Sequence, residues 1–304
     1  YRMRSDVPLA FCLSGGIDST TLVSIASKKL KQKVSTFSII DSDERYNEEE
    51  NINIINNELN CNANLIKLNQ KQNFFHDRMT QLVKQHDGPI ATISYFIHSF
   101  LSEEIAKNGF KVSISGTGAD EIFTGYYDHY LLHLETIKDT AYFDKSLEDW
   151  KKFVLPVLRN ENLKNPLYYI KNKYDRKLIY EDNFNIKKYS FANLEKNFEE
   201  KFYCEELLRN RMLNELFYEV VPVILKHDDL NSMHYSIENR SPYLDRDLLE
   251  FSLSIPPNYL INNGYQKKIL RDATNDVLND KIRLNREKKG FNASINSIVD
   301  LENP

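Results

Sequence analysis

The stretch that decides the fold is Leu13-Ser14-Gly15-Gly16-Ile17-Asp18-Ser19-Thr20, which follows an apolar run at 8–12 and precedes a helix-like run at 21–26. This order predicts a strand, a glycine turn and a helix. Adjacent Gly15 and Gly16 let the backbone curl, so that successive N–H groups point into one nest at the positive end of the helix. Such a nest binds phosphate, whereas a tight turn capped by serine and aspartate is the plainer interpretation.

Oxygen-bearing side chains surround the two glycines. Hydroxyl groups add donors, and the Asp18 carboxylate is a hard ligand suited to the magnesium that accompanies polyphosphate. The predicted nucleotide-binding residues of this loop are Leu13, Ser14, Gly15, Gly16, Asp18 and Ser19. The segment 14–19 resembles the pyrophosphate loop of N-type ATP pyrophosphatases, which cleave ATP between the α and β phosphates. No Gly-Lys-Ser/Thr closes the loop, so the sequence disfavours a kinase or GTPase P-loop and γ-phosphate transfer.

Length and composition exclude several classes of protein. The 304 residues suffice for one large domain or two smaller ones. A net charge of -4 gives no general basic field, so we expect no nucleic-acid partner. No apolar run approaches the roughly 18 residues that cross a bilayer, so we expect no membrane partner. Three cysteines without metal-ligand spacing favour a reduced, cytoplasmic compartment.

Further short apolar runs predict a parallel sheet. Strands are expected at 33–40, 65–68 and 111–114, with helical patterns between them. This alternation predicts a doubly wound α/β fold whose ligand crevice lies beyond the carboxyl ends of the strands. Ile39 at such an end either packs on adenine or is a buried strand residue. The acidic stretch 41–50 opens a helix through about residue 59, where acid compensates the helix dipole.

The fourth expected strand leads into a second loop, Ser115-Gly116-Thr117-Gly118-Ala119-Asp120-Glu121. Two loops at the same edge of a parallel sheet can face each other across the crevice, and Asp18 and Asp120 would then share magnesium. A helix cap is the alternative for either carboxylate alone. Ser115, Gly116 and Glu121 are further predicted nucleotide-binding residues.

The second loop resembles the corresponding segment of the asparagine synthetase family, which also covers β-lactam synthetases, lasso-peptide cyclases and amidotransferases of surface-glycan pathways. Three further segments extend the resemblance. Residues 229–245 are similar to a Glu-x-Arg-x-Pro-aromatic-Leu-Asp segment, 267–271 to Lys-x-x-Leu-Arg, and 286–291 to Arg-x-Lys-x-Gly-Phe. With the first loop, the resemblance runs in order from Ser14 to Phe291.

The resemblance implies a fold of the adenine nucleotide alpha hydrolase-like (HUP) type and an amide-forming reaction driven by ATP and Mg²⁺. A carboxylate substrate would be adenylated with release of pyrophosphate, and a nitrogen nucleophile would then release AMP. Lys267 would stabilise charge on the phosphates, and Asp120 would hold the metal. Glu238, Arg240 and Asp245 would either bind substrate or form a structural ion-pair network.

The resemblance also implies ammonia from glutamine, asparagine as the product, and a homodimer of the full-length protein. Residues 1–8 resemble the junction before the pyrophosphate loop, so we expect a glutaminase domain that is missing from this chain. Thr117 occupies a catalytic position where aspartate-specific relatives have Glu, and Thr cannot act as a base near neutral pH. Residues 91–92 likewise lack an acid common in relatives. An amidotransferase acting on a sugar carboxylate and a non-catalytic nucleotide-binding relative are therefore alternatives.

The second half of the chain shows weaker patterns. Residues 128–304 are expected to be the mostly helical part of the synthetase domain, against an α/β core at 1–127. His129 and His133 are four residues apart, a spacing that can bind zinc. Neither a third ligand nor a Glu beside His129 accompanies them, so the sequence disfavours a zinc site.

Overall fold

The computed structural model describes residues 2–71, 75–176, 199–289 and 293–299. The chain forms two compact units, of which unit 1 comprises Tyr1–Ala119, Val221–Leu248 and Arg271–Pro304. Unit 2 comprises Asp120–Val220 and Leu249–Leu270. These units differ from the division expected after residue 127, because two later segments fold with the first 119 residues.

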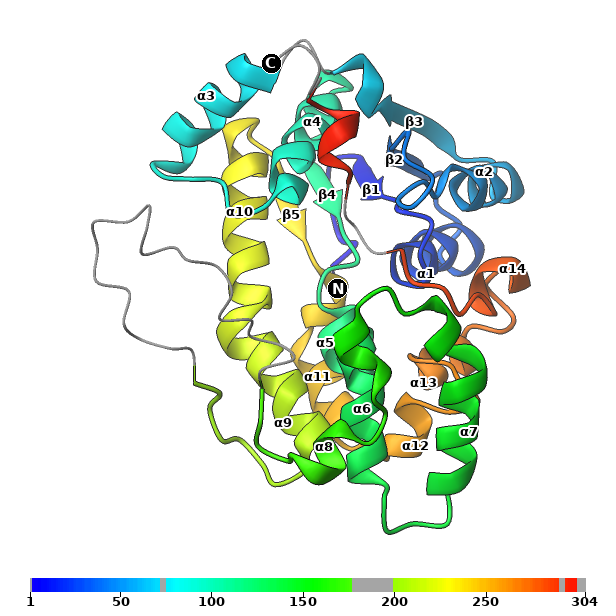
Figure 1. The fold of residues 1–304 in the computed structure, drawn as a ribbon. Helices are drawn as coiled ribbons and strands as arrows, with labels where there is room; N and C mark the ends of the chain where they lie inside the picture. The colour runs from blue at the N-terminus through cyan, green and yellow to red at the C-terminus, as the bar shows by residue number, and fades with distance from the viewer. Residues whose placement is uncertain (1, 72–74, 177–198, 290–292, 300–304) are drawn as a thin grey trace, which may run out of the picture. The chain divides into compact units, whose positions relative to one another are not determined.

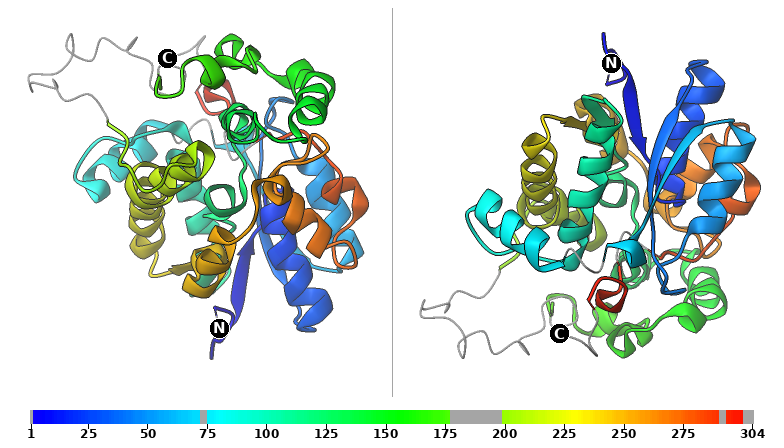
Figure 2. Two further views of the ribbon diagram at one scale, coloured as in Figure 1. Left: turned by 90° about the horizontal axis from the view of Figure 1, so that it is seen from below. Right: turned by 90° about the horizontal axis from the view of Figure 1, so that it is seen from above.

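Unit 1 is built on a five-stranded sheet with the order β3-β2-β1-β4-β5, in which all neighbouring strands are parallel. The strands are β1 (Leu9–Cys12), β2 (Ser35–Ile40), β3 (Asn62–Lys67), β4 (Val112–Ile114) and β5 (Glu238–Arg240). Its longer helices are α1 (Ile17–Ser24), α2 (Glu49–Glu58), α3 (Phe75–His86), α4 (Ile93–Lys107) and α10 (Val221–His234). Figure 2 shows the sheet with α1 and α2 on one face and α4 and α10 on the other. The doubly wound α/β fold is therefore confirmed.

The centre of unit 1 is apolar. Ala10 of β1 and Phe37 of β2 are fully buried, and Phe96 and Ile97 of α4 pack in the same cluster. Strand β1 lies between β2 and β4, so its carboxyl end is at the middle of the sheet (Figure 1). The glycine loop leaves the sheet from this central position, where parallel sheets bind ligands.

Two elements differ from the sequence-based expectation. The helix expected from the acidic stretch begins only at Glu49, because the preceding side chains close turns of their own. The Asp43 N–H donates to Asp41 Oδ1 at 2.8 Å, and the Glu49 N–H donates to Asn47 Oδ1 at 2.8 Å. Such bonds favour turns over helix. The fifth strand, β5, was not expected.

Unit 2 is helical in its described residues. Its helices are α6 (Tyr127–Thr136), α7 (Phe143–Phe153), α8 (Tyr168–Lys171), α9 (Leu207–Asn214) and α12 (Pro257–Leu260), and α9 continues as the π-helical turn Glu215–Glu219. Three further helices cross a boundary between the units: α5 (Ala119–Phe123), α11 (Arg246–Leu253) and α13 (Lys268–Ala273). The remaining helix of unit 1 is α14 (Asp280–Arg283). Within the described ranges, no helix is both long and apolar enough to cross a membrane.

Candidate functional site

The first loop folds on itself through the hydroxyls of Ser14 and Ser19. Ser19 Oγ accepts from the Ser14 N–H at 3.1 Å and lies 3.0 Å from Ser14 Oγ. The Gly16 N–H in turn points to Ser14 Oγ at 3.4 Å. The loop is thus a small ring of donors at the first turn of α1, where the helix dipole favours an anion.

The two glycines of this loop have different roles. Gly15 has a φ of +83°, and a Cβ there would lie 3.2 Å from the backbone oxygen of Glu48, so glycine is required by the backbone. Gly16 has an ordinary extended φ of −76°, and a Cβ would approach only Ser14 Oγ, at 3.5 Å. Gly16 therefore leaves open space beside the helix terminus, and Gly15 alone makes the curl.

The second loop approaches the first within unit 1. A Cβ on Gly116 would lie 3.2 Å from Asp18 Cβ and 3.2 Å from the Ser19 nitrogen, so glycine permits this close approach. The Tyr243 hydroxyl also donates to the Asp18 carbonyl at 3.1 Å. Gly118 has a φ of +95°, and Leu244 occupies the space of its missing Cβ. The structure thus brings 116–118, 243–244 and Asp18 together.

Hydroxyl groups form a short chain along the second loop. Ser115 Oγ lies 3.2 Å from Thr117 Oγ1 and 3.2 Å from Ser241 Oγ. The Ser115 N–H donates to the Arg240 carbonyl at 2.9 Å, which continues the pairing of β4 with β5. Thr117 is only half-buried. Among the described residues, the hydrogen-bond partner of the Thr117 hydroxyl is therefore another hydroxyl group and not a carboxylate.

Unit 2 contains an ion pair between two residues that the sequence singled out, of which the lysine is buried. Lys267 Nζ lies 2.5 Å from Asp120 Oδ1, and the lysine side chain is only 5% exposed. The Lys267 N–H donates to Thr124 Oγ1 at 3.4 Å, and Lys267 has a φ of +54°. The Lys267 ammonium is thus held beside Asp120 by the ion pair, and the backbone of Lys267 is held by its hydrogen bond to Thr124.

Glu121 follows Asp120 but faces the interior of unit 2. It is 3% exposed, and its Oε1 accepts from the Tyr126 hydroxyl at 2.5 Å. Burial, aided by the neighbouring Asp120 charge, raises the pKa of Glu121 to about 7. These contacts are those of a buried structural carboxyl, and its role in nucleotide binding stays a prediction.

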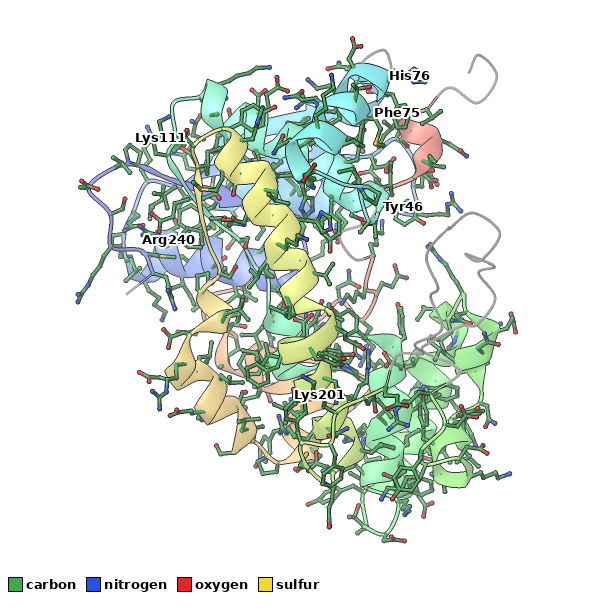
Figure 3. All side chains as sticks on the ribbon, turned by 90° about the vertical axis from the view of Figure 1, so that its left-hand side faces the viewer. Tyr46, Phe75, His76, Lys111, Lys201 and Arg240 are labelled. Atoms are coloured by element: carbon green, nitrogen blue, oxygen red, sulfur yellow. The ribbon has the colours of Figure 1, made fainter. Side chains whose placement is uncertain are left out.

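The remaining predicted residues lie in unit 1. Leu13 is buried, and its N–H donates to the Phe37 carbonyl at 2.9 Å. Ile39 is half-buried and packs against the core cluster, as either interpretation of it allows. Arg240, labelled in Figure 3, donates to Glu238 at 2.7 Å and to the Arg4 carbonyl at 2.8 Å.

Sequence reasoning missed Glu48 as a neighbour of the first loop, because it treated the whole acidic stretch as dipole compensation. Glu48 precedes α2, and its Cβ would lie 3.2 Å from a Cβ on Gly15. Burial raises the pKa of Glu48 to about 8; nearby Lys289 opposes this rise, and nearby Asp18 adds to it. The Lys289 ammonium also donates to the Asn47 carbonyl at 2.6 Å. Glu48 is thus a titratable group near Asp18 and Lys289, close to the loop.

A central glycine loop at the carboxyl end of a parallel sheet, opposed by a second glycine loop, defines the pyrophosphate-loop class of nucleotide-binding α/β proteins. The profile described as asparagine synthase matches residues 1–303. The chain belongs to the asparagine synthase family.

The chain is also similar in sequence to individual proteins named as asparagine synthetases. The chain is 29% identical over 310 residues to asparagine synthetase [glutamine-hydrolyzing] 1 of Bacillus subtilis (strain 168), covering 95% of this chain and 47% of the relative. It is 28% identical to asparagine synthetase [glutamine-hydrolyzing] 3 of the same organism, covering 94% and 45%. A shorter match, 27% identical over 41% of this chain and 20% of the relative, is to amidase chyE of Penicillium rubens. The chain therefore spans about half the length of the two Bacillus proteins.

Proposed function

We propose that this chain is the synthetase part of an ATP-dependent, amide-forming ligase that works through an acyl-adenylate. The observation that carries the proposal is the hydroxyl-lined glycine nest at the carboxyl end of β1, closely approached by the second glycine loop. Family membership and the ion pair between Lys267 and Asp120 support it. In this proposal ATP is a substrate of the chain.

The proposed first step joins the carboxylate to the nucleotide. A carboxylate oxygen attacks the α-phosphorus, and the bond from that phosphorus to the oxygen bridging to the β-phosphorus breaks. Donors of the Ser14–Ser19 nest hold the departing pyrophosphate, whose negative charge matches the positive end of α1. Lys267 stabilises charge that develops on the phosphates. A nitrogen nucleophile then attacks the acyl carbon, AMP leaves, and the nitrogen loses a proton to give the amide.

Magnesium is the proposed cofactor. The Asp18 carboxylate in the first turn of α1 is a hard oxygen ligand of the kind that Mg²⁺ prefers, and the Asp120 side chain is 21% exposed beside Lys267. The donor types therefore fit the metal. When bound by Asp18 and Asp120, Mg²⁺ would neutralise charge on the pyrophosphate.

The acceptor carboxylate is the finer part of the proposal. Two Bacillus relatives are named as glutamine-hydrolysing asparagine synthetases, which favours aspartate and ammonia from glutamine. Thr117 favours a different acceptor, because a hydroxyl bonded to Ser115 supplies no carboxylate base. A sugar carboxylate of a surface polysaccharide is the second candidate. A homodimer is also proposed for the full-length protein.

Isotope exchange between pyrophosphate and ATP tests this function, with Mg²⁺ and either aspartate or a nucleotide-linked uronic acid. We expect exchange to depend on one of these carboxylates and to fall at least about 100-fold in Asp18→Ala, because a lost charge-stabilising ligand costs several kcal/mol. Glu44→Ala removes an exposed acid from the segment after β2 and serves as the matched control. Binding of ATP without exchange, in the presence of both carboxylates, would instead favour a non-catalytic relative.

A further inference from the structure

Asp120 lies directly against the backbone of Gly125. A Cβ on Gly125 would lie only 1.7 Å from Asp120 Oδ1 and 2.4 Å from its Cγ, so the carboxylate occupies the space that any side chain would need. The neighbouring Thr124 hydroxyl accepts from the Lys267 N–H, and the Tyr126 carbonyl accepts from the Gln266 amide. The segment 124–126 is thus the support on which Asp120 and Lys267 both rest.

A buried histidine, His129, contacts the segment 124–126 through the backbone of Gly125. The Gly125 N–H donates to His129 Nδ1 at 3.2 Å, and His129 Nε2 lies 2.8 Å from Glu215 Oε2. Because Nδ1 accepts, the proton of the neutral ring lies on Nε2, which then donates to the carboxylate. The His129 and Glu215 side chains are 0% and 2% exposed. The His129 tautomer with its proton on Nε2 therefore holds the Gly125 N–H in place through a hydrogen bond to Nδ1.

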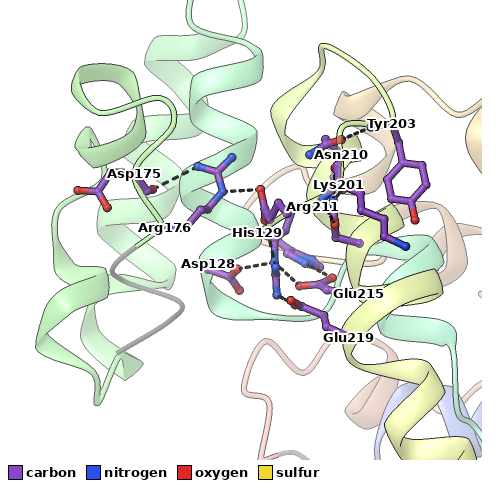
Figure 4. Close-up of polar contacts among 12 residues, drawn as sticks. Asp128, His129, Asp175, Arg176, Lys201, Tyr203, Asn210, Arg211, Glu215 and Glu219 are labelled. Atoms are coloured by element: carbon purple, nitrogen blue, oxygen red, sulfur yellow. Dashed lines mark hydrogen bonds and ion pairs between the residues drawn. The ribbon is translucent and has the colours of Figure 1, made fainter. Parts of the chain in front are cut away.

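Glu215 is in turn oriented by an arginine. Arg211 Nε donates to Glu215 Oε1 at 2.9 Å, and its guanidinium also contacts Glu200 at 3.1 Å and Glu219. Figure 4 shows Arg211 surrounded by these acidic side chains, with His129 beside Glu215. Burial raises the pKa of Glu215, whereas donors on both of its oxygens favour the charged form. Arg211, Glu215 and His129 thus form an ordered series that ends at Gly125.

A metal is the competing use of this cluster. Ligand atoms of Asp128, His129 and Glu215 all lie within 4.8 Å of one another. However, His129 Nδ1 already accepts from Gly125, so a metal on Nε2 would require an imidazolate. The Arg211 guanidinium also lies 2.9 Å from Glu215 and 3.8 Å from Asp128, where it supplies the positive charge that a metal would bring. The geometry therefore favours hydrogen-bonded support over metal binding.

We propose that His129 and Glu215 are positioning residues, which set the Gly125 backbone and through it the Asp120–Lys267 pair for adenylation. The inference rests on the proposed function and adds two residues to it. Neither residue touches substrate in this proposal. Their substitution should lower the rate of the chemical step at saturating ATP and leave the KM for ATP nearly unchanged.

Two substitutions at His129 separate the two hydrogen bonds of the ring. The Asn amide oxygen occupies the place of Nδ1, so His129→Asn keeps an acceptor for Gly125 and loses the donor to Glu215. The longer Gln side chain reaches the place of Nε2, so His129→Gln keeps a donor to Glu215 and loses the acceptor for Gly125. Each variant deletes one buried hydrogen bond, so both should lose comparable stability.

The measurement is ATP–pyrophosphate exchange at saturating ATP, with thermal unfolding of each variant as a folding control. We expect the maximal rate of His129→Gln to fall at least about tenfold below that of His129→Asn, with KM for ATP changed less than about threefold in both. Equal rates in the two variants, or a lower rate in His129→Asn, would overturn the positioning role. A wild-type protein that shows no exchange would instead contradict the proposed function itself.

Discussion

At the scale of single residues, His133 is a buried imidazole with an energetic consequence. It lies on α6 and is 1% exposed, and neither ring nitrogen has a hydrogen-bond partner among the described residues. Burial lowers the pKa of His133 from 6.5 to about 4. As the pH falls, His133 therefore becomes protonated near pH 6.5 in the unfolded chain but only near pH 4 in the folded chain. Stability from this group is complete above pH 6.5 and is lost as the pH falls toward 4.

Replacement of His133 by leucine should remove this pH dependence. Between pH 7 and pH 5, the wild-type free energy of unfolding should fall by roughly 2 kcal/mol more than that of His133→Leu, from a constant of 1.36 kcal/mol per pKa unit. Urea unfolding at several pH values measures the difference. The control is His76→Leu, which removes an exposed histidine of α3, labelled in Figure 3. Parallel pH curves for wild type and His133→Leu would contradict the prediction.

Residues of the site divide into those that local sequence reveals and those that only folding reveals. Gly15 and Asp18 lie in one short loop, where a glycine pair between strand and helix patterns points to their role. Glu48, His129 and Glu215 gain their importance from burial and from partners that are distant in the chain. His129 and Glu215 are 86 positions apart, and the charge that opposes the raised pKa of Glu48 is that of Lys289. No local pattern encodes such partners, so the sequence predicted no supporting role for these three residues.

At the scale of elements, β5 is the strand that the sequence did not predict. Its three residues, Glu238-Asn239-Arg240, show neither an apolar run nor alternation, because an edge strand of this length buries little. The other four strands were predicted to within a few residues. The three interior strands, β1, β2 and β4, consist of buried or half-buried residues, which their apolar runs reflect. The match of residues 229–245 to a family segment pointed to function there, and the backbone pairing with β4 stayed unseen.

Arg240 on β5 carries an element-scale prediction. Its Nη1 donates to the carbonyls of Arg2 and Arg4 at 3.0 and 2.8 Å, so it links the segment before β1 to the edge strand β5. We expect Arg240→Ala and Arg240→Lys both to lower the free energy of unfolding by about 1–2 kcal/mol, because an ammonium cannot replace the fork of donors. Amide hydrogen exchange at residues 2–8 should accelerate in both variants.

A matched control for Arg240 lies beside the same strand. Lys111→Ala removes an exposed charge just before β4 and leaves its carbonyl, which accepts from the Glu238 N–H at 2.9 Å. This variant should not change exchange at residues 2–8. The alternative role of Arg240 is substrate binding. It would be supported by a raised KM for the acceptor carboxylate without faster amide exchange, a result that would refute the structural role.

At the scale of the whole molecule, chain connectivity predicts that the two units unfold together. The chain passes between units four times, at 119/120, 220/221, 248/249 and 270/271, and three of these passages lie inside helices. Unfolding one unit alone would therefore break turns of α5, α11 and α13. Because helical turns form cooperatively, such breaks carry a cost for both units.

The single tryptophan makes this cooperativity measurable. Trp150 of α7 is 2% exposed and reports on unit 2, whereas Phe37 is fully buried in the sheet of unit 1. Phe37→Ala should lower the free energy of unfolding by about 3–5 kcal/mol. If the units unfold as one, it shifts the denaturant midpoint of Trp150 fluorescence as far as that of far-UV circular dichroism. Leu131→Ala, in the core of unit 2, is the reciprocal control and should move both midpoints as well. A fluorescence midpoint that ignores Phe37→Ala but follows Leu131→Ala would show two independently folding domains.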